Sequence, residues 1–200
     1  DRIKKSFVEY EANRLIYSVD NADGHRLDIE FRVSDNDVAF RYVMKAWRST
    51  YSAVILSEAT GFAFPDGTTT FLTPQSLPMI GFARTKPSYE EVYCYDGQMD
   101  VKSQYGCGYT FPALFHVAGD KWALVSETGV TSQYVASHLS DCTDGNLYTI
   151  EFPDQREING WGSRGAVVGL PAELPWRTVT VGDNLAPIVE TTVAFDVVDP

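Results

Sequence analysis

The side chains that most often perform chemistry in proteins show no catalytic spacing in this sequence. Its three histidines, His25, His116 and His138, are widely separated and match neither a metal-binding trio nor an acid–base set. Gly106-Cys107-Gly108 lacks the further glycines and the lysine of a phosphate-binding loop. The sequence therefore predicts neither a histidine metal site nor a nucleotide site.

The three cysteines, Cys94, Cys107 and Cys142, form no CxxC pair and fit no zinc motif. Cys94 and Cys107 flank a predicted hairpin, so one interpretation is a disulfide formed in an oxidising compartment. The other interpretation is three free thiols that pack as small apolar side chains. The sequence leaves both open, and it does not favour a catalytic cysteine.

Several charged side chains lie within apolar, strand-like segments. Glu58 and Glu127 either contact another domain or, more simply, are sheet-edge carboxylates bound to backbone or arginine. Arg41 and Arg177 either stack and pair with carboxylates or pack through their aliphatic stems. We expect the simpler structural role for the glutamates and stem packing for the arginines.

Tryptophan raises the question of sugar binding, because apolar sugar faces stack on aromatic rings. Of Trp47, Trp122, Trp161 and Trp176, only Trp161 lies in a predicted loop, Asn159-Gly160-Trp161-Gly162. Burial in a core or an interface is the usual fate of tryptophan, and we expect it here as well.

The elements that position these residues are predicted to be β-strands. Residues 26–33 and 38–44 alternate polar and apolar side chains around an Asp35-Asn36-Asp37 turn. Further strands are predicted at 53–58, 61–64, 89–95, 111–117, 121–126, 147–152, 166–169, 176–181 and 190–198. Many short strands separated by turn signals predict one all-β domain over residues 1–200, an antiparallel sandwich or barrel.

Two segments fit this pattern less well. Residues 131–139 are compatible with a short helix or with a strand. Residues 66–88 combine five threonines with prolines and little periodicity, so we expect a long surface excursion there.

Composition narrows the class of partner. The chain has 200 residues and a net charge of −11, from 27 acidic and 16 basic residues, which disfavours nucleic acid. No apolar run approaches the ~18 residues of a membrane span. The first residue is Asp1, so the lack of a visible signal peptide says nothing about export.

Six segments, in order, resemble one known family. They are VAFRY (38–42), SEATGF (57–62), YEEVY (89–93), FPALF (111–115), WALVSE (122–127) and the closing PWR (175–177). From about residue 7 to its end, the chain resembles the amino-terminal domain of glycoside hydrolase family 97. Members of that family are bacterial α-glucosidases and α-galactosidases.

The resemblance implies a fold and a context. It implies an antiparallel β-super-sandwich, galactose mutarotase-like, that is incomplete at its amino-terminal side, with the family's catalytic (β/α)8 barrel absent. Such a chain would pack on the barrel, help shape the pocket for an oligosaccharide substrate and be inactive alone. It also implies a periplasmic or exported protein, and the open strand edges suggest a homodimer paired through a sheet edge.

The resemblance also implies a metal role for one residue. Family 97 enzymes hold a calcium ion near the substrate, and the amino-terminal domain supplies one glutamate. Glu90 matches that position and Glu91 is the competing choice. Calcium takes about 6–8 oxygen ligands, so a single glutamate of this chain would not hold the ion alone.

Two alternatives belong to other functional classes. One is a stand-alone carbohydrate-binding or scaffold β-sandwich without catalysis. The other is a mutarotase-like epimerase, which would need a histidine and a glutamate in one cleft. The residues leave open the choice between glucoside and galactoside and between inversion and retention.

Overall fold

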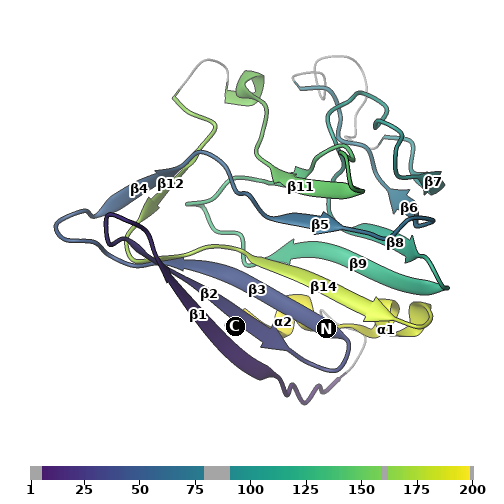
Figure 1. The fold of residues 1–200 in the computed structure, drawn as a ribbon, viewed down its shortest axis with the longest axis horizontal. Coiled ribbons are helices and arrows are strands. Elements are labelled where there is room, and N and C mark those ends of the chain that lie inside the picture. Colours follow the sequence, from purple (N-terminus) through teal and green to yellow (C-terminus); the bar gives the residue numbers. More distant parts are fainter. Residues whose placement is uncertain (1–5, 79–90, 159–161, 199–200) are drawn as a thin grey trace. The chain divides into compact units, whose positions relative to one another are not determined.

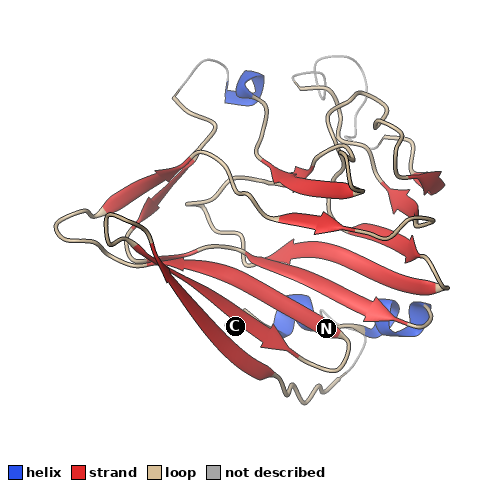
Figure 2. Ribbon diagram, in the orientation of Figure 1, coloured by secondary structure: helices blue, strands red, loops and turns tan. Residues whose placement is uncertain are grey.

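The structure, a computed structural model, describes residues 6–78, 91–158 and 162–198. These residues form antiparallel strands joined by turns, together with two short α-helices and one 3-10 turn (Figures 1 and 2). The prediction of an antiparallel all-β chain is confirmed. The chain divides into two compact units: residues 1–53, 121–134 and 167–200 form the first, and residues 54–120 and 135–166 form the second.

The first unit contains a twisted antiparallel sheet. Its strand order is β1 (Asn13–Asp20), β2 (Arg26–Val33), β3 (Asp37–Met44), β14 (Trp176–Gly182) and β9 (Lys121–Thr128). The short β13 (Ala172–Glu173) also pairs with β3. The predicted strand 26–33 has the same bounds as β2, and the turn at residues 34–36 leads directly into β3.

Alternation along β1, β2 and β3 creates two different faces. The register aligns Leu15 with Phe31 and Phe31 with Phe40, so apolar side chains share one face. It also aligns Glu30 with Arg41, which places charged side chains on the opposite face. We call these the apolar face and the charged face.

Two helices follow β14 where the sequence predicted a strand at 190–198, so that prediction was wrong. They are α1 (Leu185–Glu190) and α2 (Val193–Asp196). The Asn184 side chain accepts a hydrogen bond from the Ala186 N–H at 2.8 Å and caps α1. Val193 and Val197 are four residues apart and pack together with Ala39 and Trp176 in a buried cluster. These two valines are buried because their helical spacing brings them to the same side of the segment, although valine and threonine residues favour a strand.

The second unit contains three strands hydrogen-bonded in the order β8 (Ala113–Val117), β6 (Thr69–Leu72), β7 (Cys94–Gln98). It also contains a separate three-stranded sheet in the order β10 (His138–Leu139), β11 (Leu147–Glu151), β5 (Gly61–Ala63). The rings of Phe64 and Phe115 stack at 3.9 Å, and Tyr148 meets Phe115 edge-on. Phe115 and Tyr148 are buried, so aromatic packing forms much of this core.

Three further elements complete the described chain. β4 (Ser52–Ile55) and β12 (Ala166–Gly169) lie where the chain passes between the units, and Gln155–Ile158 form the 3-10 turn.

Three sequence-based expectations are corrected in these regions. The expected surface excursion at 66–88 contains β6, whose Thr70 and Leu72 are buried. The strand expected at 89–95 begins at Cys94, and residues 91–93 are irregular. Residues 131–137 are turns and loop, and only His138 and Leu139 are in a strand. All three cysteines are free thiols.

Candidate functional site

The glutamate with the strongest sequence case, Glu90, lies outside the described residues, as do Tyr89 and Trp161. Its competitor Glu91 is described and half-buried. One carboxylate oxygen of Glu91 accepts a hydrogen bond from Ser76 Oγ at 3.1 Å, and the other accepts one from the Tyr105 hydroxyl at 3.0 Å. Neutral hydroxyl donors thus hold the Glu91 carboxylate in place.

Among residues 6–78, 91–158 and 162–198, no three His, Cys, Asp or Glu side chains come together in a way that could hold a metal ion. A calcium ion needs about 6–8 oxygen ligands. Glu91 with its two hydroxyl donors does not supply such a set.

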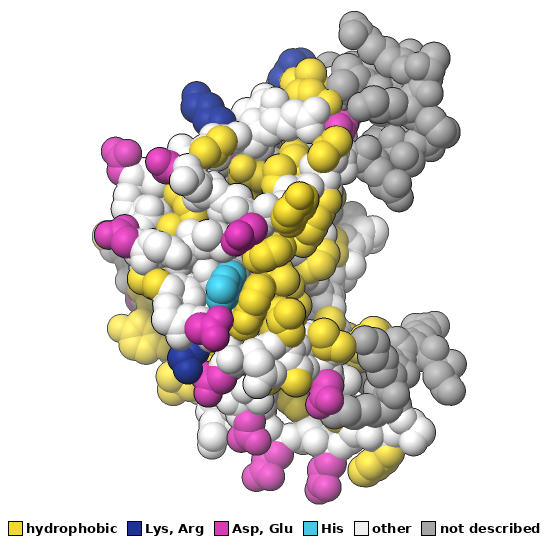
Figure 3. Space-filling model, turned by 90° about the vertical axis from the view of Figure 1, so that its right-hand side faces the viewer, with side chains coloured by type: hydrophobic (Ala, Val, Ile, Leu, Met, Phe, Trp, Pro, Cys, Tyr) yellow, Lys and Arg dark blue, Asp and Glu magenta, His cyan; other side chains and the backbone are white. Residues whose placement is uncertain are grey.

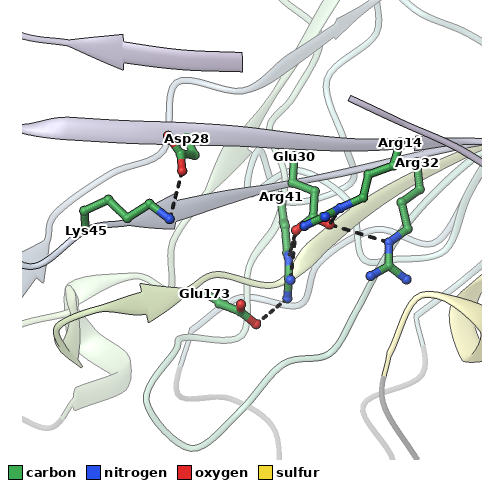
Figure 4. A network of polar contacts seen from close by, with 7 residues as sticks. All are labelled: Arg14, Asp28, Glu30, Arg32, Arg41, Lys45 and Glu173. Carbon is green, nitrogen blue, oxygen red and sulfur yellow. Dashed lines mark hydrogen bonds and ion pairs between the residues drawn. The ribbon is translucent and has the colours of Figure 1, made fainter. Parts of the chain in front are cut away.

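A cluster of charged side chains lies on the charged face of the first unit (Figure 4). Glu30, on β2, has a side chain that is only 3% exposed. Arg14 Nε donates to one of its carboxylate oxygens at 2.7 Å, and Arg41 Nε donates to the other at 2.9 Å. Arg32 Nε lies 3.7 Å from Glu30, and Arg41 also binds Glu173 at 2.6 Å.

The Trp176 ring lies against the arginines of this cluster. The guanidinium carbons of Arg41 and Arg32 lie 4.5 and 5.0 Å from the centre of a Trp176 ring. Arg41 therefore pairs with carboxylates and stacks on an aromatic ring, which corrects the expectation that it packs mainly through its stem.

Burial alone would raise the pKa of Glu30, because it penalises the charged carboxylate. The hydrogen bonds and positive charges of Arg14 and Arg41 outweigh that effect, so the pKa of Glu30 is lowered. Beside it, Asp28 binds Lys45 at 2.8 Å and Ser18 at 2.6 Å, and these two bonds lower its pKa as well. Both carboxylates are held ionised.

A second ion pair joins β9 and β14. Arg177 is buried, with its side chain 1% exposed, and it donates to Glu127, its cross-strand neighbour. The Arg177 guanidinium also lies 6.0 Å from the Tyr134 ring centre. Glu127 thus has the expected role of a sheet carboxylate bound by arginine, whereas Arg177 pairs through its charge and not only through its stem.

Asp37 binds the carboxy-terminal segment to the sheet. Its Oδ1 accepts hydrogen bonds from Thr180 Oγ1 at 2.5 Å and from Thr191 Oγ1 at 2.8 Å. Asp37 also lines an open hollow of about 830 Å³, in which further acidic residues are Glu9, Glu11, Asp35, Glu190 and Asp196. Its acidic lining disfavours anionic ligands.

The histidines are not assembled into an acid–base set. His116 Nε2 lies 2.9 Å from Asp120, and His138 Nε2 lies 3.5 Å from Glu151. His25 contacts Trp47 with ring centres 3.9 Å apart and the ring planes tilted by 55°. Each histidine thus has a different partner.

A general acid or base needs a pKa near the working pH and access to substrate. The buried carboxylates of the first unit have the opposite properties, since arginines, lysine and hydroxyls bind them. The chemistry that this arrangement supports is the positioning of sheet residues, not proton transfer.

Sequence reasoning missed Glu30 and Asp28 as organising residues. The alternation of residues 26–33 correctly indicated that Asp28, Glu30 and Arg32 share a face, but it did not indicate that this face is buried. The neighbouring strands could have indicated the cluster. Arg14 and Arg41 lie on the strands that pair with β2 on its two sides, where each can reach the Glu30 carboxylate.

The surface in Figure 3 carries acidic side chains at many places and basic ones at few, in keeping with the net charge of −11. A search for membrane-spanning helices among the described residues found none.

Residues 1–200 match the family model described as glycosyl-hydrolase 97 N-terminal. The chain belongs to this glycoside hydrolase family 97 domain family. The resemblance drawn from the six sequence segments is confirmed.

Individual relatives agree with this family. The chain is 56% identical to a structure described as a β-arabinopyranosidase, with a TM-score of 0.94, covering 99% of this chain and 32% of that one. It is 30% identical to a "Probable retaining alpha-galactosidase" of Streptomyces bingchenggensis, covering 86% of this chain and 23% of that protein. A family 97 enzyme from Pseudoalteromonas sp. strain K8, solved with panose, shares the fold at 16% identity and a TM-score of 0.70, covering 96% of this chain and 30% of that one.

The family 97 domain thus spans between about a quarter and a third of the length of these relatives.

Proposed function

We propose that the protein containing this family 97 domain is a glycoside hydrolase and that residues 1–200 are a non-catalytic part of it. The observation that carries the proposal is the match of the whole chain to the family's amino-terminal domain, with 56% identity to an arabinopyranosidase. The buried carboxylates of these residues are bound by arginine, lysine or hydroxyl groups, which supports a structural role for this part. Glycoside hydrolysis generally uses two carboxyl groups on either side of the scissile bond, and we place both outside these residues.

The relatives favour one sugar configuration over another. In the L series, a β-arabinopyranoside has the ring configuration of an α-D-galactopyranoside and lacks only the hydroxymethyl group on C5. The relatives at 56% and 30% identity are described as acting on these two sugars, whereas the panose complex belongs to an enzyme of 16% identity. We therefore propose an α-galactoside or a β-L-arabinopyranoside as the substrate of the full-length protein.

A panel of nitrophenyl glycosides tests this proposal on the full-length protein. We expect release of nitrophenol from the α-D-galactoside or the β-L-arabinopyranoside at a kcat/KM at least about tenfold above that for the α-D-glucoside. The glucoside differs from the galactoside in the configuration of the C4 hydroxyl, so it leaves polar groups that bind this hydroxyl unpaired. Preference for the glucoside would refute the sugar assignment, and no cleavage of any member would refute the hydrolase assignment.

We also propose that Glu90 contributes one ligand to a calcium ion in the full-length enzyme. The support is its place in the Tyr89-Glu90-Glu91-Val92-Tyr93 segment and the preference of calcium for carboxylate oxygen. Glu91 is already bound by Ser76 and Tyr105, which leaves Glu90 as the better candidate of the two. Family membership further supports an exported or periplasmic location as part of this proposal.

The Glu90→Gln variant of the full-length enzyme tests the ligand assignment. We expect it to need a higher calcium concentration for half-maximal activity, because an amide oxygen is a weaker calcium ligand than a carboxylate. Glu91→Gln is the matched control and should leave the calcium requirement unchanged. An unchanged requirement in Glu90→Gln would reject the assignment.

A further inference from the structure

Two arginines lie directly opposite each other on neighbouring strands of the first unit. The register of β1 and β2 pairs Arg14 with Arg32, so both side chains leave the sheet on the charged face. The Cβ atoms of such a pair lie about 4.5–5.5 Å apart, and like charges at directly opposite positions destabilise a sheet. An anion between the two guanidinium groups would relieve this repulsion.

The carboxylates nearby do not neutralise all of the positive charge. Arg14, Arg32 and Arg41 surround Glu30, and Arg41 also binds Glu173 (Figure 4). Three arginines thus face two carboxylates, which leaves one positive charge in excess. This part of the charged face therefore attracts anions, although the chain as a whole has a net charge of −11.

Arg32 supplies hydrogen-bond donors that the described chain does not use. Its Nε lies 3.7 Å from a Glu30 oxygen, which is beyond hydrogen-bond distance. Each oxygen of Glu30 already accepts a shorter bond, one from Arg14 at 2.7 Å and the other from Arg41 at 2.9 Å. The Arg32 side chain is 27% exposed, so small ions in solution have access to it.

Both guanidinium groups are held in place before any ligand arrives. The guanidinium carbon of Arg32 lies over the Trp176 ring, 5.0 Å from its centre, and Trp176 is 2% exposed. Arg14 is fixed through its Nε on Glu30, and within the described residues its two terminal nitrogens donate no hydrogen bond. Side chains that are already ordered lose less entropy when they bind a ligand.

The arrangement favours a tetrahedral oxyanion over a carboxylate. A carboxylate has two oxygens, and a single guanidinium fork binds both of them. Phosphate and sulfate have four oxygens and more negative charge, so they can bond two guanidinium groups that approach from different strands.

We propose that Arg14 and Arg32 form a binding site for a free tetrahedral oxyanion, inorganic phosphate or sulfate. The bound anion accepts hydrogen bonds from the terminal nitrogens of Arg14 and from the Arg32 guanidinium. It offsets the repulsion between the two arginines and links β1, the last strand in the order of this sheet, to β2. The site is separate from the carboxylate chemistry of glycoside cleavage and does not depend on it.

Isothermal titration calorimetry of the full-length protein with sodium sulfate tests the site, with ionic strength held constant by sodium chloride. We expect the wild type to bind sulfate with a millimolar Kd. Arg32→Gln should raise that Kd at least about tenfold, because one of two charge-assisted partners is lost. Acetate should bind the wild type more weakly than sulfate, because it has fewer oxygens and less charge.

Arg26→Gln is the matched control, because it removes the same charge from the same strand. Arg26 pairs with Asp20 at an exposed position, so its replacement should leave the Kd for sulfate unchanged. Arg32→Gln leaves Glu30 bound by Arg14 and Arg41, and circular dichroism establishes that each variant is folded.

Arg32→Lys is a second variant, which keeps the charge but loses the planar fork. It should bind sulfate more weakly than the wild type. The proposal would be overturned if the wild type did not bind sulfate or bound acetate as tightly. Equal Kd values for Arg26→Gln and Arg32→Gln, or for Arg32→Lys and the wild type, would overturn it as well.

Discussion

At the scale of single residues, buried charges organise the first unit. Glu30 is bound by Arg14 and Arg41, Asp28 by Lys45, and Glu127 by Arg177. The sequence predicted the arginine-bound role of Glu127 but not the cluster around Glu30. Alternation shows which side chains share a face of a strand, whereas the burial of that face depends on the neighbouring strands, which the pattern of one strand does not specify.

Replacing Glu30 tests the importance of this cluster. Glu30→Gln should lower the free energy of unfolding by about 3 kcal/mol, because it leaves Arg14 and Arg41 without a buried counter-charge. Chemical denaturation measures the change. Asp20→Asn is the matched control, since the Asp20–Arg26 pair is exposed and should contribute little. Equal effects of the two substitutions would contradict a structural role for Glu30.

The lowered pKa of Glu30 also predicts how this contribution varies with pH. A carboxyl group whose pKa is lowered on folding stabilises the folded state above its unfolded pKa, ordinarily 4.5, and loses that contribution as pH falls through the folded pKa. The difference in stability between the wild type and Glu30→Gln should thus be full near neutral pH and shrink below about pH 4. If the difference in stability between the wild type and Glu30→Gln did not change with pH, the loss of stability would have a steric cause and not an electrostatic one.

At the scale of elements, the sequence specified strands well where polar and apolar residues alternate. β2 and β12 have the predicted bounds, and β9 and β14 are longer than predicted at their ends. β1 was missed because its Leu15-Ile16-Tyr17 run interrupts the alternation. The strand predicted at 190–198 was wrong because Asn184 caps a helix and the valines pack at helical spacing.

Gly106-Cys107-Gly108, which has no phosphate-loop pattern, instead has a packing role in the second unit. Gly108 has a φ of +80°, and a Cβ there would lie 1.9 Å from the Leu139 carbonyl oxygen. This glycine allows Tyr109 and Leu139 to exchange backbone hydrogen bonds of 2.8 Å. The close approach of two segments far apart in the sequence was not predictable from the local pattern.

A comparison of two glycine substitutions separates the effect of this close contact on stability from the effect of backbone strain. Gly119 has a φ of +83°, and no atom lies within 4 Å of the place that a Cβ would take, so Gly119→Ala tests the backbone conformation alone. Gly108→Ala should destabilise the protein by about 1–3 kcal/mol more than Gly119→Ala, which is the usual range for overpacking. Thermal or urea unfolding measures both, and equal losses would contradict the close contact at Gly108.

At the scale of the whole molecule, family membership was predictable and the functional site was not. Six short segments in the right order identified family 97, because strand and turn residues of a fold recur with their spacing. The reactive carboxyl groups could not be found, since the buried carboxylates described here are bound by arginine, lysine or hydroxyl groups. We therefore expect the domain to supply structure to an enzyme whose chemistry lies elsewhere in the polypeptide.

The most direct test of this division of roles is a hydrolysis assay of the purified 200-residue chain beside the full-length protein. Circular dichroism first establishes that the 200-residue chain is folded as β-sheet. With nitrophenyl α-D-galactoside and β-L-arabinopyranoside, we predict turnover by the full-length protein and none above background by the folded 200-residue chain. Turnover by the 200-residue chain alone would contradict this prediction, because both catalytic carboxyl groups would then have to lie within these residues.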